Sequence, residues 1–249
     1  MFADQSGFQV RFDWGDRGID ALGPGSGLII LVDVLSFSTC VDVATSRGAV
    51  VFPCLWNDER ADNLAAEHEA VLATKQRRAS GGYSLSPQSL AEIPPGTRLV
   101  LPSPNGATLS LLAARFAPTA TACLRNAEAV ATAARLRAQT VTVIGCGERW
   151  PDGNLRFAWE DLVGAGAVIA HLPGERSPEA QAAADAFRMA APMLSQHLRN
   201  CASGRELIER GFEADLDWAG SLGASRSVPF LQDGCYTALD ELQIHHQTV

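Results

Sequence analysis

Residues 27–40 read GLIILVDVLSFSTC, a pattern that indicates a buried strand followed by a polar loop. The unbroken apolar run at 28–32 is typical of a strand that is covered on both faces in a parallel sheet. The run ends at Asp33, and a loop rich in hydroxyl groups follows. Burial of an unpaired carboxylate is costly, so we expect Asp33 to contact Mg²⁺, an arginine or backbone N–H groups. A role as cap of the next helix is an equally good reading.

Strand and helix patterns alternate outward from this stretch. Strands are expected at 8–14, 27–34, 49–54, 98–103, 120–124, 140–147 and 227–231. Helices are expected at 40–48, 57–74, 105–116, 126–138, 159–172, 177–200, 203–212 and 213–223, with Pro192 splitting the helix of 177–200. The alternation predicts a three-layer α/β/α fold with a mixed, largely parallel sheet and a helix-rich C-terminal third.

The domain organisation predicted is a single α/β domain over residues 1–249. The segment 76–97 is rich in Gly, Ser and Pro. It is the best place for a division into subdomains, and an active-site loop fits it equally well.

Charge and hydropathy exclude several classes of protein. The net charge of −8 argues against a nucleic-acid partner, which asks for a basic surface. No apolar run reaches about 18 residues, so no membrane span is expected. The first residues lack the features of a signal peptide, which predicts a cytoplasmic location. The six cysteines include no C-x-x-C pair, which argues against a zinc site.

The cationic residues are almost all arginines. Lys75 is the only lysine among the 20 lysines and arginines, and no phosphate-loop or Schiff-base context surrounds it. Anion binding is therefore expected to use Arg, backbone N–H groups or a metal. Arg77, Arg78, Arg125 and Arg149 lie nearest the candidate loops, although surface arginines are usually only solvated.

Polar residues follow three of the expected strands. Asp33 follows the first, the segment SPNGAT at 103–108 ends the second, and GCGER at 145–149 ends the third. Ligands of open α/β sheets bind beyond the carboxyl ends of strands. These ends could therefore form one site if the strands are neighbours. Asn105-Gly106 could build an anion site at a helix N-terminus or be an ordinary turn.

Glu160 and Asp161 precede an almost wholly apolar helix. Acids in a first helical turn commonly complement the helix dipole. Oxygen ligands are also what Mg²⁺ prefers, so the pair is a candidate metal site.

Four segments, in this order, resemble the 2-phosphosulfolactate phosphatase (ComB-like) family. They are LVDVLSFSTCVDVATSRGA (31–49), LPSPNGATL (101–109), LRNAEAVATAA (124–134) and VIGCGERW with WEDLVGAGAVI (143–150 and 159–169). The resemblance covers roughly residues 28 to 172. It implies Mg²⁺-dependent hydrolysis of 2-phospho-3-sulfolactate to 3-sulfolactate and phosphate, a step towards coenzyme M. The chain departs from the family pattern at Ser36, where an Arg is frequent, and in the loop at 75–90.

The leading hypothesis is a Mg²⁺-dependent phosphatase of a small anionic phosphorylated metabolite, with a homodimer left open. The catalytic candidates are Asp33, Ser38 and Thr39, and Asp33 is either metal ligand or nucleophile. The substrate-binding candidates are Arg77, Arg78, Ser103, Asn105, Gly106, Thr108, Arg125, Asn126 and Arg149. The metal candidates are Asp33, Glu160 and Asp161. The rival hypotheses are a catalytically inactive binding protein of the same fold and a nucleotide-dependent oxidoreductase that uses the glycines at 145–147.

Overall fold

A single twisted sheet organises the chain. The computed structural model describes residues 2–56, 60–78 and 81–240. Nine strands of this part form the sheet, in the order β1-β7-β2-β6-β10-β11-β3-β5-β4. Their bounds are β1 Val10–Trp14, β2 Leu28–Val32, β3 Val50–Leu55, β4 Val71–Leu72, β5 Arg98–Ser103, β6 Thr119–Ala122, β7 Val141–Gly145, β10 Pro229–Gln232 and β11 Cys235–Ala238.

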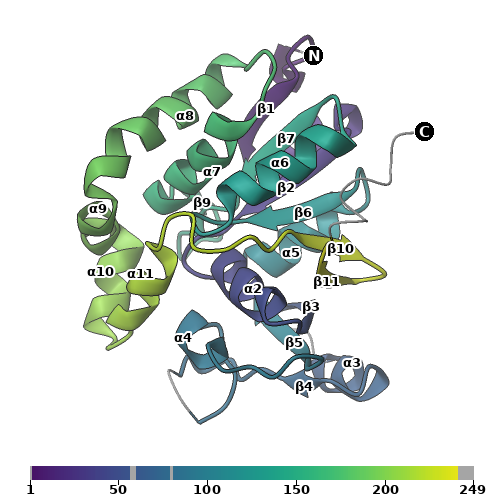
Figure 1. Cartoon of the computed structure of the whole chain (residues 1–249), viewed down its shortest axis with the longest axis vertical. Helices are drawn as coiled ribbons and strands as arrows, with labels where there is room; N and C mark the ends of the chain where they lie inside the picture. Colours follow the sequence, from purple (N-terminus) through teal and green to yellow (C-terminus); the bar gives the residue numbers. More distant parts are fainter. Residues whose placement is uncertain (1, 57–59, 79–80, 241–249) are drawn as a thin grey trace.

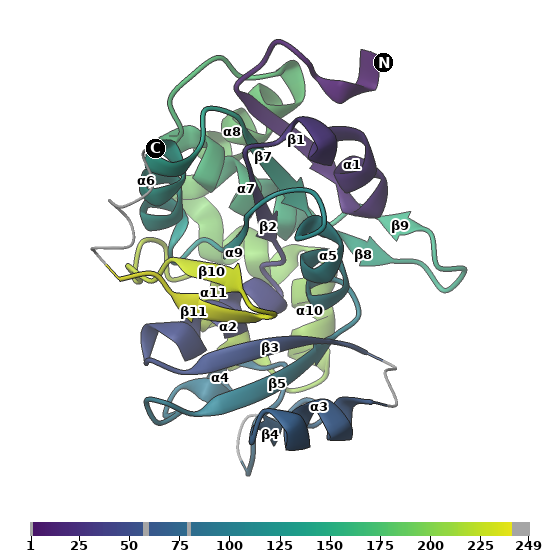
Figure 2. The same cartoon turned by 90° about the vertical axis from the view of Figure 1, so that its right-hand side faces the viewer.

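The sheet consists of two parallel blocks joined by a hairpin. Strands β1, β7, β2 and β6 are parallel to their neighbours, as are β3, β5 and β4. The hairpin β10–β11 lies between the blocks and is antiparallel to β6 on one side and to β3 on the other. Adjacent strands are each rotated in the same sense. Over several strands the rotation adds up, so that β3 and β5 run across the direction of β2 (Figure 2).

Helices cover both faces of the first block, as the continuous apolar pattern of β2 predicts. Leu28, Ile30 and Val32 pack with α6 (Ala127–Arg137), α7 (Trp159–His171) and α8 (Pro178–Ala190). Ile29 and Leu31 face the opposite way, towards α1 (Gly15–Leu22) and α5 (Gly106–Ala113). Successive side chains of a strand point to opposite faces, so one five-residue strand supplies both cores. The predicted α/β class and mostly parallel mixed sheet are confirmed.

The second block has its own helices. Helix α2 (Phe37–Ser46) and the short α4 (Pro87–Leu90) pack with β3 and β5 in one apolar cluster. Helix α3 (Ala61–Glu67) packs against the other face of the same strands.

The helix-rich C-terminal region is confirmed. After α8, a 3₁₀ turn at Ala191–Met193 contains Pro192 and separates α8 from α9 (Leu194–Asn200). Helices α10 (Ala202–Glu209) and α11 (Glu213–Ala219) follow. Together, α8 to α11 run down one side of the molecule, and α10 and α11 reach the region of α2 and α4 (Figure 1). None of the helices described is both long and apolar enough to span a bilayer.

Several elements differ from the sequence predictions. The helix expected at 57–74 is limited to α3, because Glu69 adopts a left-handed conformation (φ 48°) and Val71–Leu72 then join the sheet edge as β4. Residues 57–59 of that prediction lie outside the described residues. The patterns did not predict α1, α4, β11 or the small hairpin of β8 (Glu148–Arg149) and β9 (Leu155–Arg156).

Candidate active site

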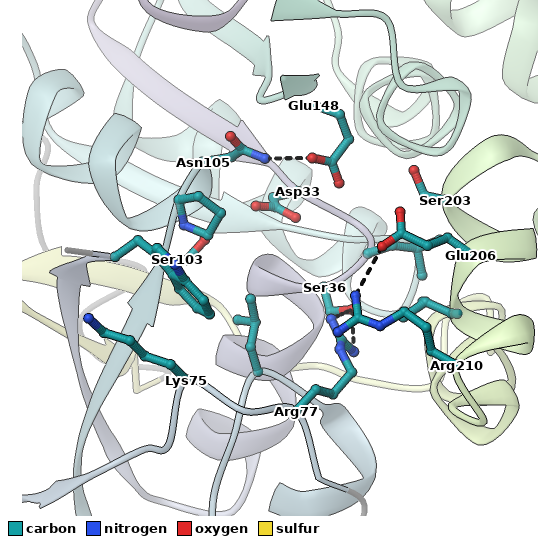
Figure 3. Close-up of a pocket in the computed structure, with 15 residues that line it drawn as sticks. Asp33, Ser36, Lys75, Arg77, Ser103, Asn105, Glu148, Ser203, Glu206 and Arg210 are labelled. Carbon is teal, nitrogen blue, oxygen red and sulfur yellow. Dashed lines mark hydrogen bonds and ion pairs between the residues drawn. The ribbon is translucent and has the colours of Figure 1, made fainter. Parts of the chain in front are cut away.

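A cavity of about 260 Å³ lies where the ends of β2 and β5 meet the C-terminal helices. Figure 3 shows Asp33 and Glu148 towards one end, the acidic end, and Lys75, Arg77 and Arg210 towards the other, with Glu206 paired to Arg210. Its polar lining consists of Asp33, Ser36, Lys75, Arg77, Ser103, Asn105, Glu148, Ser203, Glu206 and Arg210. The strand ends that the sequence identified therefore do meet, although β5 is not a neighbour of β2 in the sheet.

Asp33 is held by the N-termini of two helices. Its Oδ1 accepts a hydrogen bond from the N–H of Phe37 in α2 (3.2 Å). Its Oδ2 accepts one from the N–H of Gly106 in α5 (3.0 Å). The first N–H groups of a helix have no partner within the helix. The carboxylate that ends the apolar strand is therefore compensated by backbone donors, one of the partners expected from the sequence.

Gly106 is required by this arrangement. A Cβ atom at position 106 would lie 2.3 Å from Cδ1 of Phe37, which is fully buried. Only glycine lets α5 approach closely enough for its N–H to reach Asp33.

Two carboxyl groups at the acidic end have raised pKa values. Burial raises the pKa of Asp33 to about 6, against the lowering effect of its two backbone hydrogen bonds, and the charge of Glu160 raises it further. Burial, followed by the charge of Asp33, raises the pKa of Glu148 to about 7. The Nδ2 of Asn105 donates to Oε2 of Glu148 at 3.0 Å, which partly opposes that shift. Acids that titrate close to neutrality in a cavity are candidates for proton transfer or cation binding.

Glu160 and Asp161 lie behind the acidic end and do not line the cavity. Both oxygens of Asp161 accept backbone hydrogen bonds at 2.8 Å, from Val34 after β2 and from Gly147 after β7. Asp161 thus ties the two loops together. Burial raises its pKa well above the usual value, and the charges of Asp33 and Glu160 raise it further. Glu160 is buried and lines a neighbouring hollow together with His197 and Cys201.

Three cations line the other end. Arg77 donates from Nη1 and Nη2 to Oγ of Ser36 (3.2 and 3.1 Å) and from Nη1 to Oδ2 of Asp215 (2.5 Å). Arg210 pairs with Glu206 one helical turn earlier, at 3.0 Å. Lys75 has no ion-pair partner within the described residues.

Ser103 marks the cavity as a place for a ligand. Its side chain is buried, and its Oγ has no hydrogen-bond partner within the part of the chain that the structure describes. A buried hydroxyl without a partner is unfavourable, and an oxygen-rich ligand in the cavity would satisfy it.

The hydroxyls of Ser38 and Thr39 serve the turn around Asp33. The N–H of Asp33 donates to Oγ of Ser38 (2.9 Å), and Oγ1 of Thr39 donates to the carbonyl of Val34 (2.7 Å). Both side chains are fully buried and neither lines the cavity. Their catalytic role stays a prediction.

Six of the nine substrate-binding candidates do not line the cavity. Arg125 pairs with the buried Asp42, and Asn126 donates to the carbonyl of Ser227. Thr108 donates to the carbonyl of Pro104, Arg149 to the carbonyl of Gly153, and Arg78 to Gln76. Their roles in substrate binding also stay predictions, whereas Arg77, Ser103 and Asn105 line the cavity and Gly106 supports Asp33.

Six polar cavity residues are not among the candidates, namely Ser36, Lys75, Glu148, Ser203, Glu206 and Arg210. The sequence does contain an indication that Glu148 lies in the site, because it adjoins Arg149 at a polar strand end. Neighbours on a strand point to opposite sides, and the structure turns Glu148 inward. No sequence motif marks Lys75. Ser203, Glu206 and Arg210 lie on or next to α10, in a sequence that is ordinary for an amphipathic helix. They reach the cavity only because the fold places α10 near the ends of the strands.

The donor set bears on the magnesium expected from the sequence. The described residues include no cluster of three or more His, Cys, Asp or Glu side chains suited to a metal ion. Asp33 and Glu148 do line one cavity, and the charge of Asp33 raises the pKa of Glu148. Magnesium is commonly bound by one or two carboxylates, with water and substrate phosphate as further ligands. The residues present fit Mg²⁺ in that manner.

Comparison with known proteins identifies the family. The sequence model described as 2-phosphosulpholactate phosphatase matches residues 22–234. A 2-phosphosulfolactate phosphatase of Methanothermobacter thermautotrophicus is 30% identical over 228 residues, which cover 89% of this chain and 94% of that protein. A probable 2-phosphosulfolactate phosphatase of Gloeobacter violaceus is 31% identical over 209 residues, 80% of this chain and 86% of that protein. The chain belongs to the 2-phosphosulfolactate phosphatase family.

Membership of the 2-phosphosulfolactate phosphatase family confirms the resemblance seen in the sequence. It makes the chain a phosphoric monoester hydrolase by class and sets aside the nucleotide-dependent oxidoreductase. The matched region contains the strand ends, the loop with Lys75 and Arg77, and helix α10. The cavity is therefore built wholly from residues within the part that the family shares.

Proposed function

We propose that the chain hydrolyses 2-phospho-3-sulfolactate to 3-sulfolactate and inorganic phosphate with Mg²⁺. The observation that supports this most strongly is the cavity itself. It combines two carboxyl groups whose pKa values lie near neutral pH, Asp33 and Glu148, with three cations at the opposite end. A substrate that carries phosphate, carboxylate and sulfonate groups suits this separation of acidic and cationic side chains.

The acidic end would bind the metal and the phosphate. Asp33 and Glu148 are the residues that would hold Mg²⁺. When bound, the ion would supply positive charge to the phosphoryl oxygens. Ser103 would donate its unpartnered hydroxyl to a phosphate oxygen. The N-termini of α2 and α5 add fixed positive potential on the same side, since both point at Asp33.

The cationic end would bind the remaining anionic groups. Arg77 presents a planar guanidinium that can grip two oxygens, whereas Lys75 supplies a point charge. Arg210 is paired with Glu206, so its charge is shared between that partner and a ligand. Recognition of two anionic groups in addition to phosphate would select this substrate over simpler phosphate esters.

Asn105 would hold the carboxyl group of Glu148 in place for Mg²⁺, because its Nδ2 donates to Oε2 at 3.0 Å. Without a bound ion the pKa of Glu148 is about 7, and a bound ion would favour the charged carboxylate. Asp33 would act either as metal ligand alone or also as the nucleophile that attacks phosphorus. An acid-stable phosphoenzyme that is trapped by quenching wild-type protein, and is absent from Asp33→Asn, would assign the nucleophilic role.

The experiment that tests the proposal is a phosphate-release screen. The panel contains 2-phospho-3-sulfolactate, phosphoglycolate and esters whose phosphate is the only anionic group. Each is tested with Mg²⁺ and with EDTA. We expect the sulfonated substrate to have the highest kcat/KM. No release from any ester would favour the inactive binding protein instead.

A further inference from the structure

Asp215 is a buried carboxylate next to the cavity but not part of its lining. It lies on α11, and its residue is 1% exposed. Oδ2 accepts a hydrogen bond from Nη1 of Arg77 at 2.5 Å. Oδ1 accepts bonds from Oγ of Ser86 (2.6 Å) and from the N–H of Gln88 (3.4 Å). Asp215 therefore joins the C-terminal helices to the segment that carries Arg77 and to the start of α4.

The guanidinium of Arg77 is fixed from several directions. Ser36 accepts from both terminal nitrogens, and the ring of Phe212 lies 5.7 Å from the guanidinium carbon. Within the described residues, Asp215 is the carboxylate that pairs with Arg77. The Nε–H and one hydrogen on Nη2 have no hydrogen-bond partner among those residues. A fixed guanidinium with donors to spare can bind an anion without first losing side-chain freedom.

A stabilising role alone explains the ion pair of Asp215 and Arg77 poorly. The desolvation of two buried charges offsets most of their attraction, so a buried ion pair is weak evidence for a stabilising role. The geometry explains a different role better, because Asp215 contacts both Arg77 and the start of α4, where the loop that carries Arg77 ends.

We propose that Asp215 is a positioning residue, which holds Arg77 in the orientation that binds an anionic group of the substrate. This inference rests on the proposed function of the cavity. Arg77 would contact the substrate in the ground state and the transition state alike. Loss of Asp215 should therefore raise KM and leave kcat nearly unchanged.

A double-mutant cycle tests the proposal on the full chain. We expect Asp215→Asn to raise KM about tenfold and Arg77→Gln to raise it about 30-fold. The double variant should match Arg77→Gln, because Asp215 acts only through Arg77. The same four proteins are titrated with inorganic phosphate by calorimetry, which measures binding without turnover. Asp215→Ser is made in parallel, since its smaller side chain leaves room for water beside Ser86.

Two control variants separate positioning from general effects. Asp217→Asn removes a carboxylate from the same helix, which pairs with Arg199 at 2.6 Å and has a side chain that is 65% exposed. Ser86→Ala removes a bond to Asp215 that does not involve Arg77. Asp217→Asn should leave KM and phosphate affinity unchanged. Ser86→Ala should lower the melting temperature and change KM less than threefold.

The outcomes are distinguishable. Unchanged KM in Asp215→Asn, or additive effects in the double variant, would overturn the proposal. So would failure of both Asp215 variants to fold, which would mean a purely structural role, or lack of phosphate binding and turnover by the wild type. Coupled losses of phosphate affinity, without turnover of 2-phospho-3-sulfolactate, would retain the positioning role of Asp215 and reject only the proposed substrate.

Discussion

The N–H of Gly106 donates to Oδ2 of Asp33 at 3.0 Å, although the residues are 73 positions apart and follow strands separated by four others in the sheet. This bond joins the two parallel blocks at the cavity. The twist of the sheet brings the end of β5 to the end of β2, and the hydrogen bond fixes the approach. The acidic end of the cavity therefore depends on the packing of α5 against α2.

Replacement of Gly106 by alanine should disrupt this approach. The new Cβ would overlap the ring of Phe37, which is fully buried. Overpacking of this kind costs about 1–3 kcal/mol of the free energy of unfolding. Urea denaturation should show that loss, and kcat/KM should fall because Asp33 loses a donor. Leu111→Ala, a half-exposed site on the same helix, should change both quantities little, and a stable, fully active Gly106→Ala would contradict the close packing.

The raised pKa of Asp33 predicts a dependence of stability on pH. Folding raises its pKa from 3.8 to about 6, so folding favours the neutral form. Protonation of Asp33 stabilises the folded protein relative to the folded protein with a charged Asp33. This stabilisation is complete below pH 3.8 and is lost as the pH rises through 6. Above pH 6 the buried charge costs about 3 kcal/mol.

Asp33→Asn should therefore gain stability over wild type as the pH increases. Urea denaturation in EDTA should show the difference in unfolding free energy growing by about 1–2 kcal/mol between pH 5 and pH 8. The change with pH is the test, since the amide also alters one hydrogen bond at every pH. A difference that is constant with pH would show that Asp33 is not buried with a raised pKa.

Arg77 and Arg78 form a natural matched pair. Arg77 lines the cavity and forms a fork of hydrogen bonds, whereas Arg78 is exposed and bonds to Gln76. Arg77→Lys should raise KM about tenfold, roughly 1.4 kcal/mol, because an ammonium group cannot reproduce the fork. Arg78→Lys should leave KM unchanged. Equal KM values for both variants and wild type, on esters with one and with two additional anionic groups, would remove Arg77 from substrate binding.

The metal proposal distinguishes Glu148 from Glu160. Glu148→Gln should raise the Mg²⁺ concentration for half-maximal activity at least about tenfold, because it removes one of the two carboxylates proposed to hold the ion, Asp33 and Glu148. Glu160→Gln should shift it less than threefold, because Glu160 faces the neighbouring hollow. A Mg²⁺ titration of activity measures both. The reverse order would assign the ion to the Glu160–Asp161 pair that the sequence favoured.

Local patterns predict the parts of the site that one strand end supplies. Asp33, Ser103 and Asn105 follow apolar strand runs, and that placement alone marks them. The orientation of a side chain at a strand end depends on register. The sequence therefore does not show that Glu148, and not Arg149, faces the cavity. Lys75 and Arg210 carry no motif, since they reach the cavity only through long-range packing. The hairpin β10–β11, which separates the two blocks, likewise depends on pairing with strands far away in the sequence.

In the proposed mechanism, this cavity hydrolyses a phosphomonoester through Asp33. The mechanism is tested by the release of inorganic phosphate from 2-phospho-3-sulfolactate by wild type and by Asp33→Asn, each with Mg²⁺ and with EDTA. It predicts release by wild type with Mg²⁺, loss of that activity in EDTA, and a fall in kcat/KM of at least about 100-fold in the variant, about 2.7 kcal/mol. A folded Asp33→Asn protein that retains most of the wild-type activity would contradict it.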